Sequence, residues 1–231
     1  SCDLEKVRDL CTTHDSILIA DPTMASPKNA KVSAHADVVI NSLTKYANWE
    51  GDVMMGSAVF PKKSAVGLKI KELALQYRTK PFQQDMERTA EQIPFYDNFI
   101  ERTNESQQEI VEFLLSHPKI KEVYWAYQNA TGKNYRKIAG DGKPGCVVSF
   151  EIKGDFRKFY DNLELLKSPS FGTEFSLCCP YIYLAHYDLI TSEIGRNKLA
   201  KAGLSPNLLR LSVGLEEPGL IKEKIALALK V

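Results

Sequence analysis

Three side chains with reactive or phosphate-binding chemistry follow a short apolar run near the amino-terminal end of the chain. The β-branched run from Asp37 to Ile40 predicts a buried strand, and Ser42, Thr44 and Lys45 come directly after it. Two hydroxyls within three residues of one amine, just past a strand's carboxyl end, are groups that proteins place around a phosphate and an electrophilic carbon. Surface loops are also rich in these residue types, so a solvated loop is the alternative for this stretch alone.

A second candidate, Asp21, ends another apolar run. The stretch from Ile17 to Ala20 is typical of a strand buried on both faces, and Asp21 and Thr23 follow it around Pro22. About sixteen residues lead on to the next strand, which is enough for a crossover between two parallel strands. Parallel strands would open Asp21 and the lysine loop onto the same edge of the sheet, where open α/β sheets bind ligands. Because Asp-Pro often starts a turn, a structural turn or helix cap is the alternative for Asp21.

Arg210 is the third candidate, because it lies inside an otherwise apolar run. The run from Leu209 to Val213 predicts a strand. A guanidinium is costly to bury there unless a carboxylate pairs with it. Arg210 is therefore either half of a structural ion pair or an anchor for an anionic substrate.

The composition favours a protein that binds small molecules. The chain has 231 residues, 44% of them hydrophobic and 26% charged, which suits one large domain or two modest ones. A net charge of +1 gives no sign of a nucleic-acid or membrane partner. The five cysteines form no CxxC pair, so we expect neither a disulfide framework nor a metal site. Without a long apolar stretch or a secretory signal, the sequence predicts a cytoplasmic protein.

The remaining pattern predicts alternating helices and strands, with a domain boundary near residue 100. The expected helices cover residues 3–14, 63–77, 81–115 with a break near Pro94, 156–166 and 218–229. Further strands are expected at 52–60, 120–126, 145–153 and 209–213, and a loop at 128–143. In the helix at 63–77, Leu68, Leu73 and Leu75 are the expected apolar anchors.

Four stretches, taken together, resemble successive signatures of the cystathionine γ-synthase family of pyridoxal-phosphate enzymes, the Cys/Met metabolism group. They are IADPTMASP, SLTKYAN, SFGTEFSL and LLRLSVGLEE, and ERTNESQQEIVEFLLSHPKIKEVYW is similar to the family's link between its two domains. The resemblance implies an α/β fold of fold type I. Residues 1–100 would form part of the large, mixed-sheet cofactor-binding domain, and residues 101–231 a smaller α+β carboxyl-terminal domain.

The resemblance also implies roles for the candidate residues. Lys45 would bind pyridoxal 5'-phosphate (PLP) covalently and then move protons between substrate carbons. Asp21 would pair with the pyridine nitrogen, with Thr23 close to the ring. Ser42 and Thr44 would donate hydrogen bonds to the cofactor phosphate.

On the substrate side, the resemblance places Arg210 on the α-carboxylate of an amino acid, with Ser170 beside that carboxylate. The implied reaction is γ-replacement, which joins cysteine to an activated homoserine ester to form cystathionine. The alternatives are γ- or β-elimination from cystathionine or methionine, or a catalytically incomplete remnant that serves as a structural or interaction module.

The chain resembles roughly the second half of such an enzyme. Family members carry an earlier segment with a glycine-containing phosphate loop and an aromatic residue that stacks on the pyridine ring. A sheet cut through its middle would expose apolar edges and faces. We therefore expect a homo-oligomer, dimer or tetramer, or pairing with a missing amino-terminal half.

Overall fold

The computed structural model describes residues 1–128 and 131–230, which fold as two compact units. The first unit contains residues 1–101 and 126–145, and the second contains residues 102–125 and those from 146 onward. Residues 126–145 fall in the first unit, although the expected boundary near residue 100 assigned them to the second domain. The reason is local packing: Ile138 packs on the first unit's core and accepts a hydrogen bond from the Lys31 amide at 2.8 Å.

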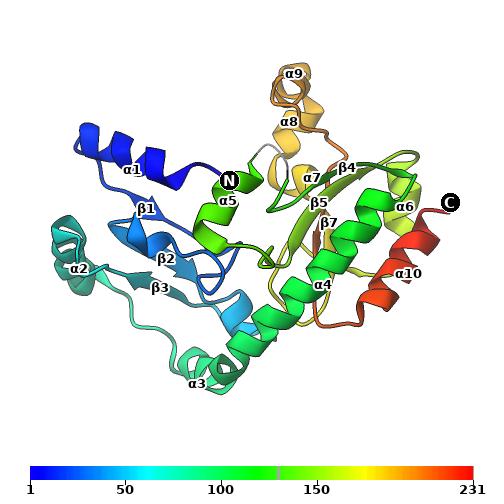
Figure 1. The fold of residues 1–231 in the computed structure, drawn as a ribbon. Coiled ribbons are helices and arrows are strands. Elements are labelled where there is room, and N and C mark those ends of the chain that lie inside the picture. Colours follow the sequence, from blue (N-terminus) through cyan, green and yellow to red (C-terminus); the bar gives the residue numbers. More distant parts are fainter. Residues whose placement is uncertain (129–130, 231) are drawn as a thin grey trace. The chain divides into compact units, whose positions relative to one another are not determined.

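A three-stranded mixed sheet forms the centre of the first unit, with strand order β1-β2-β3 (Figure 1). β1 pairs in parallel with β2, as predicted, and β2 pairs antiparallel with β3. The elements of this unit are α1 (Leu4–Thr13), β1 (Ile19–Ala20), η1 (Val32–Ala34), β2 (Val38–Ser42), η2 (Tyr46–Asn48), β3 (Gly56–Val59), α2 (Ala65–Tyr77), α3 (Gln83–Gln92), η3 (Ile93–Phe95) and α5 (Gly132–Ala139).

Helix starts in this unit follow from capping side chains. The Asp3 carboxylate accepts a hydrogen bond from the Lys6 amide, which confirms the predicted start of α1. Ser64 caps α2 in the same way, through the amide of Gly67 at 2.9 Å. The predicted break near Pro94 is confirmed, because η3 separates α3 from α4 (Tyr96–Ser116), a helix that contributes residues to both units.

Two predictions about burial in this unit are wrong. The run that ends in β1 is buried on one face only, since Leu18 and Ala20 are buried whereas Ile17 and Ile19 are 51% and 55% exposed. The anchors expected for α2 are exposed as well, Leu73 at 55% and Leu75 at 51%. The physical reason is that these side chains border open cavities instead of packing against other residues: Ile19 lines one cavity and Leu75 another. The crossover between β1 and β2 also contains the short 3₁₀ helix η1 where an α-helix is common.

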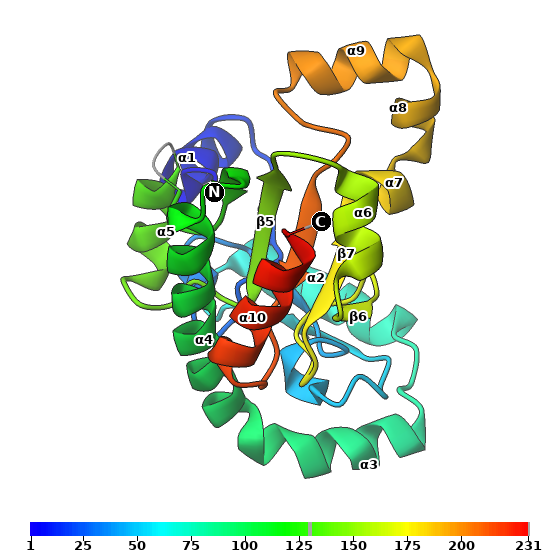
Figure 2. The same ribbon diagram turned by 90° about the vertical axis from the view of Figure 1, so that its right-hand side faces the viewer.

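A five-stranded sheet of order β4-β5-β8-β7-β6 forms the centre of the second unit. All pairs are antiparallel except β6 with β7. Helices α6 and α10 lie side by side over this sheet, and α8 and α9 extend away from it (Figure 2). The elements are β4 (Ile120–Tyr124), β5 (Val147–Ile152), α6 (Phe156–Asn162), β6 (Leu166–Lys167), β7 (Leu177–Pro180), α7 (Tyr181–Ala185), α8 (Tyr187–Thr191), α9 (Glu193–Lys201), β8 (Leu209–Ser212) and α10 (Pro218–Ala228).

The second unit has an almost fully buried core. Phe150 on β5, Leu209 and Leu211 on β8, and Ile221 and Ile225 on α10 are each 0% exposed. The predicted strands β4, β5 and β8 and the final helix are confirmed. Helices alternate with strands along the chain and both sheets contain parallel and antiparallel pairs, which confirms the predicted α/β class with a mixed sheet.

The prediction of a loop at 128–143 is wrong in part, because α5 occupies Gly132–Ala139. Residues 129–130 lie outside the described part of the chain.

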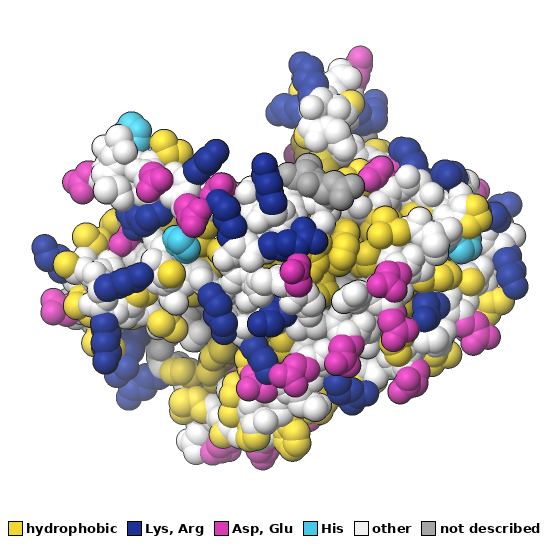
Figure 3. Space-filling model, viewed as in Figure 1, with side chains coloured by type: hydrophobic (Ala, Val, Ile, Leu, Met, Phe, Trp, Pro, Cys, Tyr) yellow, Lys and Arg dark blue, Asp and Glu magenta, His cyan; other side chains and the backbone are white. Residues whose placement is uncertain are grey.

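Within the described residues, no helix is long and apolar enough to span a membrane. The same residues contain no cluster of His, Cys, Asp or Glu suited to a metal ion. Basic and acidic side chains are both distributed over the face shown in Figure 3.

Candidate active site

The ends of β1 and β2 join three of the predicted site residues through one buried hydroxyl. The Thr23 hydroxyl donates to Asp21 Oδ1 at 2.5 Å, and the Thr23 amide donates to the same oxygen at 2.9 Å. In turn, Thr23 Oγ1 accepts a hydrogen bond from the Ser42 amide at 2.9 Å. Thr23 is 7% exposed, whereas Asp21 is exposed. The parallel pairing of two short strands therefore brings Asp21, Thr23 and Ser42 to one edge, as the sequence predicted.

Hydrogen bonds to backbone groups hold Thr44 and Lys45 in the loop after β2. Thr44 Oγ1 accepts a hydrogen bond from the Met55 amide at 3.1 Å, and the Thr44 amide donates to the Met55 carbonyl at 3.2 Å. The Lys45 amide donates to the carbonyl of Ser42 at 3.4 Å, which closes a turn. Lys45 then precedes η2 with an extended backbone. The lysine and both hydroxyl residues are half-buried within this turn.

Two residues that sequence reasoning missed anchor this loop from behind. The Tyr46 hydroxyl donates to the carbonyl of Met24 at 2.6 Å, and the Tyr46 side chain is 2% exposed. Asn48 is fully buried, and its amide nitrogen donates to the Leu43 carbonyl at 2.7 Å. Their position directly after Lys45 is the feature of the sequence that could have predicted this anchoring role. Their contacts hold the backbone on both sides of Lys45.

A cavity of about 760 Å³ in the first unit is lined by both Asp21 and Ser42. Its wall also contains two basic side chains from the α2 region, Lys71 and Arg78, and apolar residues of β2 and β3. Residues with acidic, hydroxyl and basic side chains therefore line one cavity near the carboxyl ends of β1 and β2, which is where open α/β sheets bind ligands, whereas Thr23, Thr44 and Lys45 are not among its lining residues.

Arg210 and Ser170 lie together in the second unit. Arg210 is 7% exposed in the middle of β8, and its guanidinium donates hydrogen bonds to the carbonyls of Pro169 and Ser170. Among the described residues, no carboxylate forms an ion pair with Arg210. Of the two interpretations left open by the sequence, the structural ion pair is therefore absent from the described part of the chain.

The Arg210 guanidinium also contacts aromatic rings. Its Cζ atom lies 4.5 Å from the ring centre of Tyr181 and 5.7 Å from that of Phe171. Tyr181 is half-buried, with its ring beside the guanidinium. The sequence could have predicted this contact between Tyr181 and Arg210 only if the pairing of β7 with β8 were known, because that pairing places Cys179 opposite Arg210.

Two of the signature stretches interlock next to Arg210. The Glu216 carboxylate accepts hydrogen bonds from the amide and the hydroxyl of Ser176, both at 2.8 Å, and Ser176 Oγ accepts one from the Gly214 amide. A Cβ atom on Gly214 would lie 2.3 Å from the Glu174 carbonyl oxygen, so only glycine fits there. The SFGTEFSL and LLRLSVGLEE stretches thus form one structural unit around β7 and β8.

The comparisons with known proteins agree with this arrangement. A family model described as Cys/Met metabolism PLP-dependent enzyme matches residues 1–230. The chain belongs to this family. Its members depend on PLP, and they include enzymes of the transsulfuration type.

Two curated relatives and one solved structure illustrate the similarity. The L-2-amino-4-chloropent-4-enoate dechlorinase/desaturase of Streptantibioticus cattleyicolor is 35% identical over 222 residues, which cover 96% of this chain and 44% of that protein. The cystathionine gamma-synthase of Neurospora crassa is 32% identical, over 99% of this chain and 37% of that protein. A solved structure of a putative O-acetylhomoserine (thiol)-lyase from Campylobacter jejuni superposes with a TM-score of 0.86, at 22% identity, over 100% of this chain and 62% of that chain.

These comparisons confirm the fold type I class, and they show that the chain spans 44% or less of the two curated relatives. The Campylobacter jejuni structure contains N'-pyridoxyl-lysine-5'-monophosphate, so that protein carries the cofactor on a lysine.

In the present chain, the donor set of Asp21, Ser42, Thr44 and Lys45 fits PLP chemically. It offers a carboxylate for a protonated ring nitrogen, hydroxyls for a phosphate and an amine for the carbonyl carbon.

Proposed function

We propose that this protein is a cystathionine γ-synthase-like enzyme that performs γ-replacement on an activated homoserine ester with cysteine. The observation that carries the proposal is the linkage of Asp21, Thr23 and Ser42 by hydrogen bonds beside the Lys45 turn. The similarity to the cystathionine gamma-synthase of Neurospora crassa supports the choice of reaction. The first unit would belong to the cofactor-binding domain, and the second would form the small domain.

Each candidate residue would have a separate role toward the cofactor or the substrate. Lys45 Nζ would hold the cofactor and, once released, accept and return protons at the substrate carbons. The Asp21 carboxylate, oriented by Thr23, would keep the cofactor's ring nitrogen protonated, and Ser42 and Thr44 would donate to its phosphate. When bound, PLP supplies an electron sink for carbanion chemistry at the amino acid.

Arg210 would bind the α-carboxylate of the amino-acid substrate, with Ser170 beside it. The support is a buried guanidinium that is held by carbonyl oxygens and that has no carboxylate partner among the described residues. A guanidinium in this state can pair with a ligand carboxylate without first breaking an ion pair.

Elimination is the second candidate reaction. The Streptantibioticus cattleyicolor relative is named a dechlorinase/desaturase, so removal of a leaving group occurs among members similar to this chain. Incubation of the PLP-loaded protein with an activated homoserine ester, with and without cysteine, would separate the two. Cysteine-dependent cystathionine supports replacement, a 2-oxo acid with ammonia supports elimination, and no product from any ester, cystathionine or methionine supports the remnant. The Lys45→Ala variant is the control for each product.

We also propose that the site is completed by further protein, either a second copy of the chain in a dimer or tetramer, or an amino-terminal half. The support is the exposed apolar face of the first unit at Ile17, Ile19 and Ile40. Analytical ultracentrifugation would show an oligomer or a stable complex. A folded, active monomer of the 26.0 kDa chain would contradict this proposal.

A further inference from the structure

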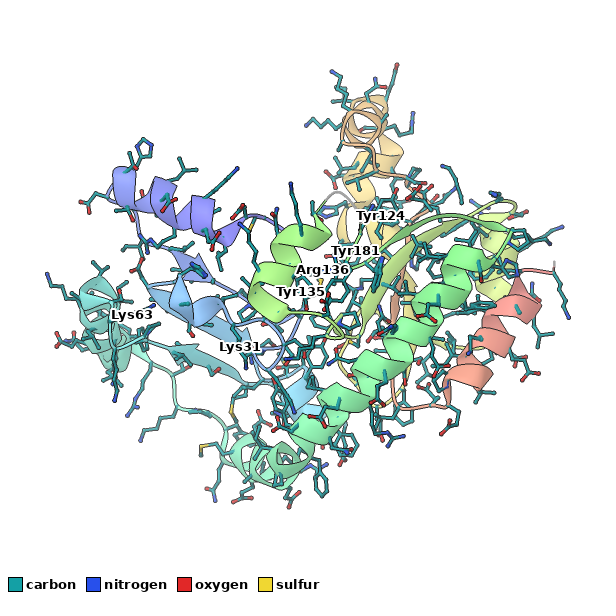
Figure 4. All side chains as sticks on the ribbon, viewed as in Figure 1. Lys31, Lys63, Tyr124, Tyr135, Arg136 and Tyr181 are labelled. Atoms are coloured by element: carbon teal, nitrogen blue, oxygen red, sulfur yellow. The ribbon has the colours of Figure 1, made fainter. Side chains whose placement is uncertain are left out.

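The environment of Arg210 follows from strand pairing. β8 lies between β5 and β7, and the register places Ser149 and Cys179 on either side of Arg210. β7 ends one residue after Cys179, and α7 starts at once with Tyr181. Because Tyr181 follows Cys179 by two residues, its side chain reaches the same neighbourhood as the cross-strand partner of Arg210. Figure 4 labels Tyr181, at this start of α7.

Backbone carbonyl oxygens and two aromatic rings contact the guanidinium. Carbonyl oxygens accept hydrogen bonds from one terminal nitrogen, the ring of Tyr181 lies 4.5 Å from Cζ, and the ring of Phe171 lies at 5.7 Å. The Cys179 thiol also lies against Arg210; burial raises the pKa of this thiol, although the nearby positive charge opposes the rise. The thiol is therefore neutral and supplies no counter-charge.

An aromatic partner has a different consequence from an acidic partner. A carboxylate would occupy the N–H groups of the guanidinium that a substrate carboxylate needs. An aromatic ring attracts the cation through its π-face and accepts no conventional hydrogen bond from the guanidinium edge. Tyr181 can therefore stabilise and orient the buried cation while leaving donors available.

We propose that Tyr181 is a positioning residue that holds Arg210 in the orientation needed to bind the α-carboxylate of the substrate. The inference rests on the proposed function, because it assumes that Arg210 binds this carboxylate. The ring contacts that the structure gives Tyr181 are with Arg210 and, edge to face, with His186 at 6.2 Å. The aromatic ring, not the hydroxyl, is thus the part that acts.

The neighbouring tyrosine of α7 provides a matched control. Tyr183 stacks on Phe156 at 5.9 Å, with the ring planes 15° apart, and is half-buried like Tyr181. Tyr181→Leu and Tyr183→Leu therefore remove the same side-chain atoms from the same short helix. Tyr181→Phe keeps the ring and should rescue the function.

Two measurements test the inference. The first compares two constants of the PLP-loaded protein, the apparent KM for an L-amino-acid substrate and the inhibition constant of the corresponding amine without the carboxylate. The ratio of the inhibition constant to KM measures the preference for the carboxylate. Since a cation–π contact is worth about 0.5–2 kcal/mol, Tyr181→Leu should lower the preference for the carboxylate about 2- to 30-fold, mainly through KM and with kcat less affected. Tyr181→Phe and Tyr183→Leu should keep the wild-type preference.

The second measurement is the Nε–Hε NMR signal of Arg210, assigned by its loss in Arg210→Lys. The signal should shift and exchange faster with water in Tyr181→Leu but not in Tyr183→Leu. An unchanged preference or an unchanged signal in Tyr181→Leu would overturn the inference, as would equal effects of the two leucine variants. Tyr181→Met replaces Tyr181→Leu if the latter does not fold.

These outcomes separate the inference from the proposed function. If the wild-type protein prefers the carboxylate and Tyr181→Leu keeps that preference, only the role of Tyr181 is refuted. If the wild-type protein has no preference for the carboxylate, the role of Arg210 in the proposed function is refuted, and the inference falls with it.

Discussion

The hydrogen bonds of Thr23 allow a sharp test of the site's architecture. Thr23→Val replaces the hydroxyl with a methyl group of similar size. The change removes the donor to Asp21 at 2.5 Å and the acceptor of the Ser42 amide at 2.9 Å. Thr23→Ser keeps both hydrogen bonds and is the matched control. Both variants leave the remaining hydrogen bond to Asp21, from the Thr23 amide, in place.

The expected cost follows from these two contacts. A hydrogen bond to a charged group contributes about 1.5–3 kcal/mol, and leaving a buried donor unsatisfied costs about 1–3 kcal/mol. Asp21 is exposed, so its contribution belongs at or below the lower end of that range. Thr23→Val should therefore destabilise this edge of the sheet by about 2–4 kcal/mol, whereas Thr23→Ser should cost less than about 1 kcal/mol.

Amide hydrogen exchange at Ser42 measures this effect locally, without assuming that the two units unfold together. Exchange at Ser42 should become at least about tenfold faster in Thr23→Val and change little in Thr23→Ser, since 1.4 kcal/mol corresponds to a factor of ten. Urea unfolding of the same variants gives the corresponding change in the free energy of unfolding. Wild-type exchange at Ser42 in Thr23→Val, or equal effects of Val and Ser, would refute the linkage of the two strand ends.

Two further predictions concern the start of β2. Burial alone raises the pKa of Asp37, but a backbone amide, the Arg8 guanidinium at 2.7 Å and a serine hydroxyl together lower it below its ordinary value. The ionised Asp37 carboxylate therefore stabilises the folded state above its unfolded pKa of about 3.9, and this stabilisation is lost as the pH falls through its lower folded pKa. The urea midpoints of wild type and Asp37→Asn should consequently converge on acidification. Gly67→Ala would place Cβ 2.3 Å from the Asp37 carbonyl oxygen and should lower the free energy of unfolding by about 1–3 kcal/mol. The control Gly219→Ala, with open space around it, should be neutral or stabilising by up to about 1 kcal/mol. Equal urea midpoints for the two variants would contradict this prediction.

Local signals in the sequence predicted the elements that position the candidate site. The β-branched run before Ser42 gave β2, and the apolar run before Asp21 gave the strand that pairs with it in parallel. Asp3 marked the start of α1 through its capping side chain. Each of these signals lies within a few residues of the feature that it predicts, and nothing in the tertiary structure opposes it.

Features that depend on distant residues could not be predicted in this way. The run that forms β7 is short and does not alternate, so its pairing with β8 was missed, and with it the contact of Tyr181 with Arg210. The helix α5 within the expected loop was missed too; its first residue, Gly132, lies so close to Tyr127 that a Cβ there would be 2.6 Å from the Tyr127 carbonyl oxygen. The exposure of Leu73 reflects the absence of a covering layer in the described residues, which a helical pattern cannot reveal.

The central claim is that Lys45 is the residue that binds PLP. The direct measurement is to add PLP to the purified protein, reduce with borohydride, digest, and locate the pyridoxyl label by mass spectrometry. We expect a visible absorbance band before reduction, one labelled peptide containing Lys45, and loss of both in Lys45→Ala. Equal labelling of wild type and Lys45→Ala, or label spread evenly over surface lysines, would contradict the claim.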